Sequence, residues 1–335
     1  MKRPWLAPLV PLYAAGAAWR AFTLRHAWQG IDRLRWPVIS IGNLSSGGSG
    51  KTPLTIALAR LLAARGVSID VLSRGYGRLG SHPMRVDPAG TAEQFGDEPL
   101  LIAREAGVPV YVAPQRCLAG ILAETDARKD VLAQQLSAGS ASSHAHILDD
   151  GFQHRRLHRD FDILLLDSID FHDTLLPAGN LREPLRAALR ATVLAVPAGD
   201  IAFEAELRAF GWQGPLWRVR RHMELPVFRG PALAFCGIAR PAQFFSGLKA
   251  AGVRVSQTIA FPDHHRYTAK DVKHLEAAAK HSGSLAFLTT EKDKVRIEAL
   301  DLGRPLLTAG LRTEIEDEQA AFDWLVNRIA APQPR

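Results

Sequence analysis

The chain has 335 residues, of which 47% are hydrophobic and 22% charged, a composition typical of a globular protein with a sizeable core. Its length favours two domains of unequal size. The net charge of +7 predicts an anionic partner, which can be nucleic acid, an acidic membrane or a phosphorylated substrate. Cys117 and Cys236 have no metal-ligand or redox spacing, which argues against a disulfide scaffold and fits a reducing compartment.

The N-terminus begins with an apolar segment. Residues 4–18 carry no charged side chain and are flanked by basic residues. The run is shorter than the roughly 20 residues that a transmembrane helix needs, and prolines interrupt it. We interpret residues 1–35 as a membrane-facing segment that lies on an anionic surface. Buried hydrophobic packing and a cleaved signal peptide, with a site near Ala15-Gly16-Ala17, are the alternatives.

Short apolar runs then alternate with helical patterns. The first set of predicted strands comprises residues 37–42, 67–73, 109–113, 145–149, 161–167 and 192–197. Between the first two of them, residues 51–65 have apolar side chains at helical spacing and stop before Gly66. This alternation predicts an α/β fold with a mainly parallel sheet of the phosphate-loop type and helices on both faces.

The pattern pauses around residues 220–230 and resumes with strands near 231–236, 253–260 and 285–290. We therefore predict a phosphate-loop domain over 36–222 and a smaller α/β domain over 225–335. Residues 133–146 are rich in serine and alanine and predict a flexible surface insertion.

Residues 40–54, SIGNLSSGGSGKTPL, match most of the phosphate-loop pattern G-x-x-x-x-G-K-[ST], although Ser45 stands where the first glycine belongs. Glycine permits the backbone to turn its N–H groups around phosphates, and the following helix points its positive end at them. Lys51 is expected to act on charge at the β- and γ-phosphates, and Thr52 to offer its hydroxyl to Mg²⁺. A glycine-rich turn that binds nothing is the alternative. The predicted nucleotide contacts are Gly47, Gly48, Ser49, Gly50, Lys51 and Thr52.

A carboxylate at the end of an apolar strand is expected to complete the magnesium site. Two segments qualify, HILDDGFQ with Asp149 and Asp150, and FDILLLD with Asp167. We favour the first, because its polar cluster lies at the carboxyl end of a strand, where parallel sheets bind ligands. The predicted metal ligands are thus Thr52, Asp149, Asp150 and Gln153, and Asp167 is interpreted as structural.

Seven motifs together carry a resemblance to a known family. They are GNLSSGGSGKTP, LSRGYG, FGDEP, ILDDGFQH, PAGNLREP, FPDHH and LTTEKD, and the resemblance that they carry runs from about residue 36 to about residue 296. In this order they resemble the tetraacyldisaccharide 4'-kinases, the lipid A 4'-kinases of Gram-negative bacteria. The resemblance implies transfer of the γ-phosphate of ATP, with Mg²⁺, to the 4'-hydroxyl of a tetraacylated glucosamine disaccharide 1-phosphate. It also implies work at the cytoplasmic face of the inner membrane, with no nucleic acid and no obligate protein partner.

The resemblance also assigns substrate residues. It places Arg74, Asn180 and Arg182 near phosphate or lipid, and Lys292 near the base or its loop. Solvated surface arginines are the alternative. Because Lys292 and Asp293 are adjacent, they do not form the guanine-reading N/T-K-x-D pattern, and adenine is preferred.

The predicted general base is Asp97 of FGDEP, at the start of a helix. Alone it is a poor base, because an unperturbed aspartate has a pKa of about 3.9. A neutral His264 from FPDHH is expected to orient it and share the proton, with His265 as the fallback. A helix cap and a structural histidine are the alternatives. The two residues lie on opposite sides of the predicted boundary, so catalysis would require the domains to close.

Two other classes of protein remain as alternatives. A phosphate-loop ATPase or GTPase that acts as a switch or partitioning protein would show a guanine-reading motif or a metal-binding His/Cys tract. A nucleic-acid-binding protein would interleave basic and aromatic residues on one face. The sequence shows neither pattern.

Overall fold

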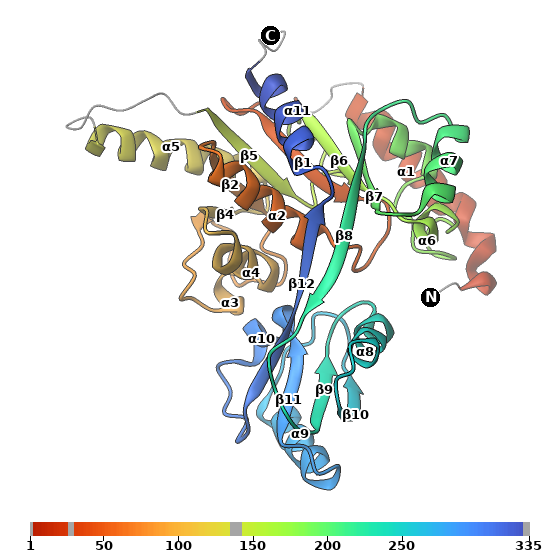
Figure 1. Cartoon of the computed structure of the whole chain (residues 1–335). Coiled ribbons are helices and arrows are strands. Elements are labelled where there is room, and N and C mark those ends of the chain that lie inside the picture. The colour runs from red at the N-terminus through yellow and green to blue at the C-terminus, as the bar shows by residue number, and fades with distance from the viewer. Residues whose placement is uncertain (1–2, 26–29, 135–142, 331–335) are drawn as a thin grey trace.

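The chain folds into two lobes joined by two long strands (Figure 1). The structure, a computed structural model, describes residues 3–25, 30–134 and 143–330. Within these ranges twelve strands form one sheet in the order β10-β9-β11-β12-β8-β7-β6-β1-β5-β2-β4-β3. Neighbouring strands are parallel except for the pairs β12–β8 and β3–β4. The predicted mainly parallel α/β fold is confirmed.

The bounds of the elements agree with the sequence-based prediction to within a few residues for most strands. The strands are β1 (Val38–Asn43), β2 (Ser68–Ser73), β3 (Met84–Arg85), β4 (Val110–Val112), β5 (His144–Asp149), β6 (Phe161–Leu165), β7 (Val193–Pro197), β8 (Leu216–Glu224), β9 (Ala232–Cys236), β10 (Val255–Ala260), β11 (Ala286–Thr290) and β12 (Leu306–Ile315). The helices are η1 (Pro4–Leu9), α1 (Val10–Arg25), α2 (Lys51–Ala64), α3 (Ala92–Phe95), α4 (Asp97–Ala106), α5 (Arg116–Gln134), α6 (Ser168–Phe171), η2 (Leu185–Arg190), α7 (Ile201–Ala209), α8 (Pro241–Ala250), α9 (Ala269–His281), α10 (Glu291–Ile297) and α11 (Glu318–Ala330).

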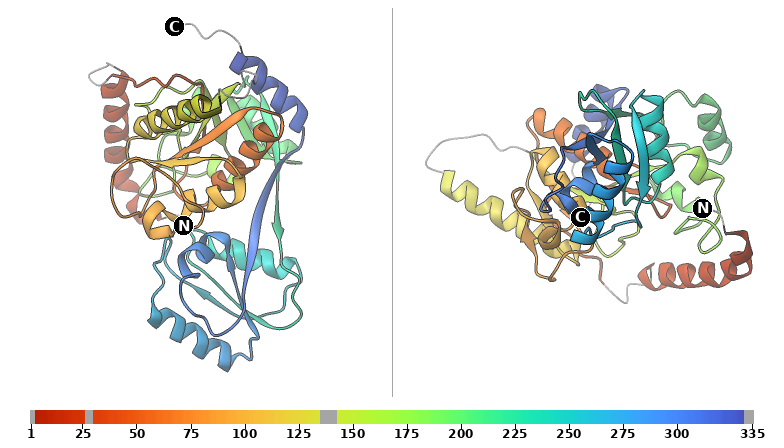
Figure 2. Two further views of the ribbon diagram at one scale, coloured as in Figure 1. Left: turned by 90° about the vertical axis from the view of Figure 1, so that its left-hand side faces the viewer. Right: turned by 90° about the horizontal axis from the view of Figure 1, so that it is seen from below.

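The larger lobe comprises residues 30–134, 143–218 and 312–330, and helices cover both faces of its sheet (Figure 2). On one face α2, α4 and α11 share a hydrophobic cluster with the central strands, which includes the fully buried Ile41 and Leu58. On the other face α5 packs near Leu148, and α7 with η2 packs near Leu194. Strand β1 lies between β5 and β6 and is buried along its whole length, so the phosphate loop starts from the rigid centre of the sheet.

The smaller lobe comprises residues 225–310. Its strands β9, β10 and β11 carry α9 and α10 on one face, where Phe235 is fully buried, and α8 on the other, where Leu248 is fully buried. The long antiparallel pair β8–β12 continues the sheet from one lobe to the other and was not predicted. After β12 the chain returns to the larger lobe, where Leu325 of α11 is fully buried in the cluster that contains α2. The last helix therefore packs on the larger lobe rather than on the three-stranded part of the smaller lobe, and the predicted division at 225 stays a prediction.

The N-terminal segment forms η1 and α1 at the outer edge of the larger lobe (Figures 1 and 2). No residue of η1 is buried, and five large apolar side chains of the segment are exposed, namely Trp5, Leu9, Leu12, Trp19 and Phe22. Packing of this segment into the core is therefore not what the structure shows. None of the helices in the described residues is long and apolar enough to cross a membrane.

The serine- and alanine-rich stretch 133–146 includes the last two residues of α5 and the first three of β5. Most of it, residues 135–142, lies outside the described residues, so the predicted insertion stays a prediction.

Candidate active site

A cavity of about 840 Å³ lies at the carboxyl ends of the central strands, between the two lobes. The phosphate loop and the ends of β2 and β5 form one side of it, and residues of the smaller lobe, among them His264 and Lys292, form the other. The site therefore contains groups from chain segments that are far apart in the sequence. It lies where parallel sheets generally bind their ligands.

The phosphate loop has the backbone that its glycines predict. Gly50 has φ +87° and directly precedes α2, and Gly47 has φ +116°. A side chain at either position would strain the backbone, because residues with a Cβ rarely adopt positive φ. The first N–H groups of α2 have no intrahelical partners, and Lys51 and Thr52 at this end of the helix line the cavity. The loop is thus shaped for an anion.

Ser45 replaces the first glycine of the pattern for a structural reason. Its hydroxyl donates a hydrogen bond of 2.6 Å to the carboxylate of Asp170, which is in turn 3.1 Å from the guanidinium of Arg240 in the smaller lobe. Arg221 of β8 donates a bond of 3.0 Å to the backbone carbonyl of Ser49. The phosphate loop is therefore contacted by residues from the lobe connection and the smaller lobe.

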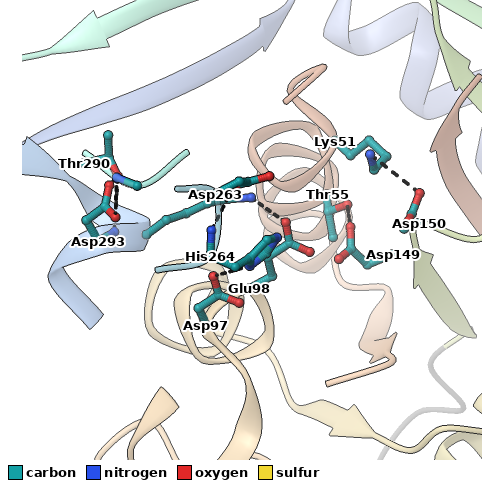
Figure 3. Close-up of polar contacts among 12 residues, drawn as sticks. Lys51, Thr55, Asp97, Glu98, Asp149, Asp150, Asp263, His264, Thr290 and Asp293 are labelled. Atoms are coloured by element: carbon teal, nitrogen blue, oxygen red, sulfur yellow. Dashed lines mark hydrogen bonds and ion pairs between the residues drawn. The ribbon is translucent and has the colours of Figure 1, made fainter. Parts of the chain in front are cut away.

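Lys51 and Arg182 converge on the same acceptors. Lys51 lies 3.6 Å from Asp150 (Figure 3) and donates to Oδ1 of Asn43 over 3.0 Å. Arg182 donates to the same Oδ1 over 2.5 Å and to Asp150 over 3.1 Å. Burial alone would raise the pKa of Asp150, but the two cations outweigh it and lower the pKa to about 2. Asn43 ends β1 and was not singled out in the sequence, although it positions both cations.

The predicted metal ligands lie close to this cluster. Asp149 is almost fully buried and accepts a hydrogen bond of 3.1 Å from Thr55 (Figure 3). Its burial, together with the charges of Glu98 and Asp150, raises its pKa to about 7. Gln153 donates to the backbone carbonyl of Asn43 over 2.8 Å, and its Oε1 is buried without a partner.

Asp167, the competing candidate, has a structural role. Its side chain accepts the N–H of Asp170 over 2.8 Å and so caps the N-terminus of α6. Its carboxylate also lies 3.9 Å from Arg240. This capping position agrees with the interpretation of Asp167 as structural.

Asp97 and His264 meet across the lobes. Asp97 begins α4 in the larger lobe, His264 lies in the loop after β10, and Nδ1 of His264 is 3.1 Å from Oδ2 of Asp97 (Figure 3). Asp97 does not cap its helix, so the helix-cap alternative is wrong. The hydrogen bond to the Asp97 carboxylate raises the pKa of His264. His265 instead pairs with Asp271, 3.2 Å away, and is not part of this contact.

Two described non-glycine residues have positive φ, and both belong to the cavity. Asp150 has φ +50° and His264 has φ +56°. Such conformations are uncommon for residues with a Cβ and concentrate at functional sites. The backbone evidence therefore points to the same cavity as the side chains.

The remaining predicted residues differ in where their side chains point. Arg74 follows β2 and lines the cavity. Lys292 lines it too, but forms an ion pair with Glu98 of the opposite lobe. Asn180 donates its side-chain N–H to Asp173 over 2.7 Å, and its backbone carbonyl accepts the N–H of Ser46 over 2.8 Å. The backbone of Asn180 therefore supports the phosphate loop, while its side chain does not line the described cavity.

Arg116 is a cavity residue that the sequence interpretation missed. It is the first residue of α5, is only 8% exposed and lines the cavity. Its Nη1 donates a long bond of 3.3 Å to the carbonyl of Pro114, its Nε has no partner, and among the described residues it forms no ion pair. A buried cation without a counter-ion is costly, so the site is suited to an anion from a ligand. A lone arginine after a short strand gave no signal for this in the sequence.

The order of the strands, the phosphate loop and the cavity between the lobes place this chain in the class of phosphate-loop α/β phosphotransferases. A family model for tetraacyldisaccharide-1-P 4'-kinase, LpxK, matches residues 2–330. The chain belongs to this family.

Individual relatives agree with the family match. The tetraacyldisaccharide 4'-kinase of Koribacter versatilis is 39% identical, over 97% of this chain and 99% of its own. That of Syntrophus aciditrophicus is 36% identical, over 88% and 84%. The crystal structure of LpxK from Aquifex aeolicus, described as an "apo" form in complex with ATP, superposes with a TM-score of 0.72 at 31% identity, over 97% of this chain and 98% of that one.

The resemblance predicted from the motifs is thereby confirmed. The protein is a kinase, a phosphotransferase with an alcohol acceptor, that phosphorylates the 4'-hydroxyl of a tetraacylated glucosamine disaccharide 1-phosphate in lipid A biosynthesis. The alternative of a switch or partitioning protein is not supported.

Proposed function

We propose that the chain binds ATP and Mg²⁺ at the phosphate loop and transfers the γ-phosphate to its lipid at the cytoplasmic face of the inner membrane. One observation carries the proposal. The phosphate loop, with its lysine, lines the cavity from the larger lobe, and His264, which is hydrogen-bonded to the buried Asp97, lines it from the smaller lobe. A donor held by the first and an acceptor hydroxyl held by the second would meet inside that cavity, which is what phosphoryl transfer requires.

In this proposal residues 47–52 surround the phosphates with backbone N–H groups. Lys51 leaves Asp150 to contact the β- and γ-phosphates, and Arg182 stays with Asp150 and Asn43. Arg116 and Arg74 supply further positive charge on the acceptor side of the cavity. Preorganised cations stabilise charge on the transferring group without reorganising during the reaction.

The donor set fits Mg²⁺. The hydroxyl of Thr52, the carboxylate of Asp149 and the partnerless, buried Oε1 of Gln153 are oxygen donors, which hard divalent cations prefer. Thr52 and Asp149 are the residues that we propose to hold the ion, with Gln153 and Asp150 beside them. When bound, Mg²⁺ neutralises charge on the phosphates.

The Asp97–His264 pair takes the proton of the 4'-hydroxyl as that oxygen attacks phosphorus. Asp97 is the weaker base of the two, because its pKa is held below the usual range. His264, whose pKa the same hydrogen bond raises, is the better final proton acceptor. The carboxylate orients the imidazole, and the pair acts as a unit. The sequence had suggested the reverse, with Asp97 as the base and His264 as the residue that orients it.

The N-terminal segment is proposed to lie on the membrane. The segment exposes the apolar side chains of Trp5, Leu9, Leu12 and Trp19, and its Tyr13 hydroxyl donates a bond of 3.1 Å to the backbone carbonyl of Arg182. The segment therefore reaches the loop that carries an active-site cation. A lipid held at the membrane surface by this segment would be close to the cavity.

The proposal is tested by incubating the purified protein with labelled ATP, Mg²⁺ and the tetraacylated disaccharide 1-phosphate in mixed micelles. We expect label in the lipid, and none with the same lipid lacking a free 4'-hydroxyl. Labelled inorganic phosphate in place of labelled lipid would contradict it.

A further inference from the structure

Arg296 links the smaller lobe to Asp97. It lies near the end of α10, and its guanidinium reaches the carboxylate at the start of α4 in the larger lobe. Nη2 is 2.5 Å and Nε 2.9 Å from Oδ2 of Asp97. Both side chains are buried, at 7% and 6% exposed. Arg296 does not line the cavity, so its contact is with Asp97 and not with substrate.

The guanidinium is itself held in place within the smaller lobe. Its Nη1 donates to the carbonyl of Gly237 over 2.9 Å and to Asp293 over 3.1 Å. Asp293 is fully buried and also accepts a bond from Thr290 over 2.6 Å (Figure 3) and one from Tyr267 over 2.9 Å. The direction of the arginine is therefore fixed by its own lobe before it meets Asp97.

The donors to Asp97 converge on one atom. Nδ1 of His264 and the Nε and Nη2 of Arg296 all contact Oδ2 of Asp97, and both residues belong to the smaller lobe. The orientation of a carboxylate in the larger lobe is thus determined by the position of the smaller one.

We propose that Arg296 is a positioning residue for phosphoryl transfer, which fixes Asp97 only when the lobes are closed and keeps its carboxylate ionised opposite His264. The inference rests on the proposed role of the Asp97–His264 pair. Arg296 competes with the imidazole for the same oxygen. It thereby limits how strongly the carboxylate stabilises the protonated ring, so that the ring can accept a proton near neutral pH.

The charges around Asp97 and His264 are consistent with this role for Arg296. Burial alone would raise the pKa of Asp97, but the hydrogen bond with His264 and the charge of Arg296 bring it below its usual range. The other charged groups facing the pair are Lys292 and Asp293 on α10, Glu98 on α4, and Asp263 beside the ring. Without the guanidinium, the protonated forms of both members would be favoured.

A simple inter-lobe ion pair is the competing explanation, and the molecule contains a matched control for it. Glu298, directly after α10, lies 2.6 Å from Arg104 of α4, so this pair joins the same two helices away from Asp97. Glu298→Gln weakens lobe contact and leaves Asp97 untouched. A purely tethering role predicts that Glu298→Gln and Arg296→Gln behave alike.

The experiment measures kcat, KM for ATP and the pH dependence of kcat/KM for the lipid in Arg296→Gln, Arg296→Lys, Glu298→Gln and Asp97→Asn. For Arg296→Gln we expect kcat to fall by about 10²-fold, as for a misplaced catalytic group, and the acidic limb to move to higher pH. Arg296→Lys should lose kcat with its acidic limb unchanged, and Glu298→Gln should match the wild type.

Wild-type kcat in Arg296→Gln, or an equal loss in Glu298→Gln, would overturn the inference. If Arg296→Gln does not fold, as judged by thermal unfolding and ADP binding, Arg296→Lys decides, and an unchanged kcat there overturns it. Full activity in Asp97→Asn would instead show that the proposed pair is wrong. An impaired Asp97→Asn beside a normal Arg296→Gln rejects the positioning role alone.

Discussion

The amine of Lys51, the first residue of α2, lies 3.6 Å from the carboxylate of Asp150, which directly follows β5. An acidic side chain thus pairs with the lysine that is proposed to contact ATP. Both groups sit at the edge of the cavity rather than in the hydrophobic core.

Lys51→Ala is therefore expected to abolish turnover without unfolding the protein, since the lysine stabilises charge and packs in no cluster. Lipid phosphorylation should fall by about 10²-fold or more. Circular dichroism and thermal unfolding provide the folding control. A folded variant with near wild-type activity would show that the loop is wrongly assigned.

Asp149 predicts a pH-dependent requirement for magnesium. Because burial and neighbouring charges raise its pKa to about 7, much of the carboxyl is protonated below pH 7, and a divalent cation must displace that proton. We expect the Mg²⁺ concentration for half-maximal activity to rise by up to about tenfold per pH unit as the pH falls below 7.

Asp149→Asn should remove this pH dependence and raise the magnesium requirement at every pH. Asp167→Asn is the matched comparison, since Asp167 caps α6. If the comparison variant loses magnesium dependence and Asp149→Asn does not, the wrong strand has been chosen.

The Asp97–His264 pair is expected to be non-additive. Asp97→Ala and His264→Ala should each lower kcat by about 10²-fold or more, with little change in KM for ATP. The double variant should lose far less than the product of the two, because either change disables the same unit. Fully multiplicative losses would show two independent roles.

Arg116 provides a test of the acceptor side. Replacing this buried cation by alanine should lower kcat by about 10²-fold, because a charged group that faces the transferring phosphate is lost. Arg116→Lys should retain part of the activity, and ADP binding should be unchanged in both. If Arg116→Ala instead raises only KM for the lipid, the cation contacts the phosphate of the acceptor lipid.

The N-terminal segment is expected to bind membranes. Deletion of residues 1–25 should weaken binding to vesicles that contain anionic lipid by about tenfold or more and lower kcat/KM for the lipid, while ADP binding survives. Replacing the exposed Trp5, Leu12 and Trp19 by serine should reproduce the loss without shortening the chain. A native protein that begins near Ala18 would favour the signal-peptide alternative.

The sequence by itself determined the local elements of this protein. Apolar periodicity located the parallel strands, and GGSGKT located the loop, because a phosphate-binding turn needs glycine at fixed places in a short segment. The motifs also identified the family. The long strands β8 and β12 escaped prediction, since β8 alternates exposed arginines with buried residues beside a region that resembles a linker.

Only the tertiary structure decided which side chains share the cavity. Asp97 and His264 are 167 residues apart, and Arg296 reaches Asp97 from 199 residues away, so no local pattern could pair them. Asn180 belongs to the motif PAGNLREP, yet its side chain is bonded to Asp173. Arg116 belongs to none of the motifs, yet it lines the cavity. The direction of a side chain, and whether it finds a counter-ion, depend on how the two lobes pack. Burial and charge across the interface determine that packing, and the spacing of residues along the chain does not encode it.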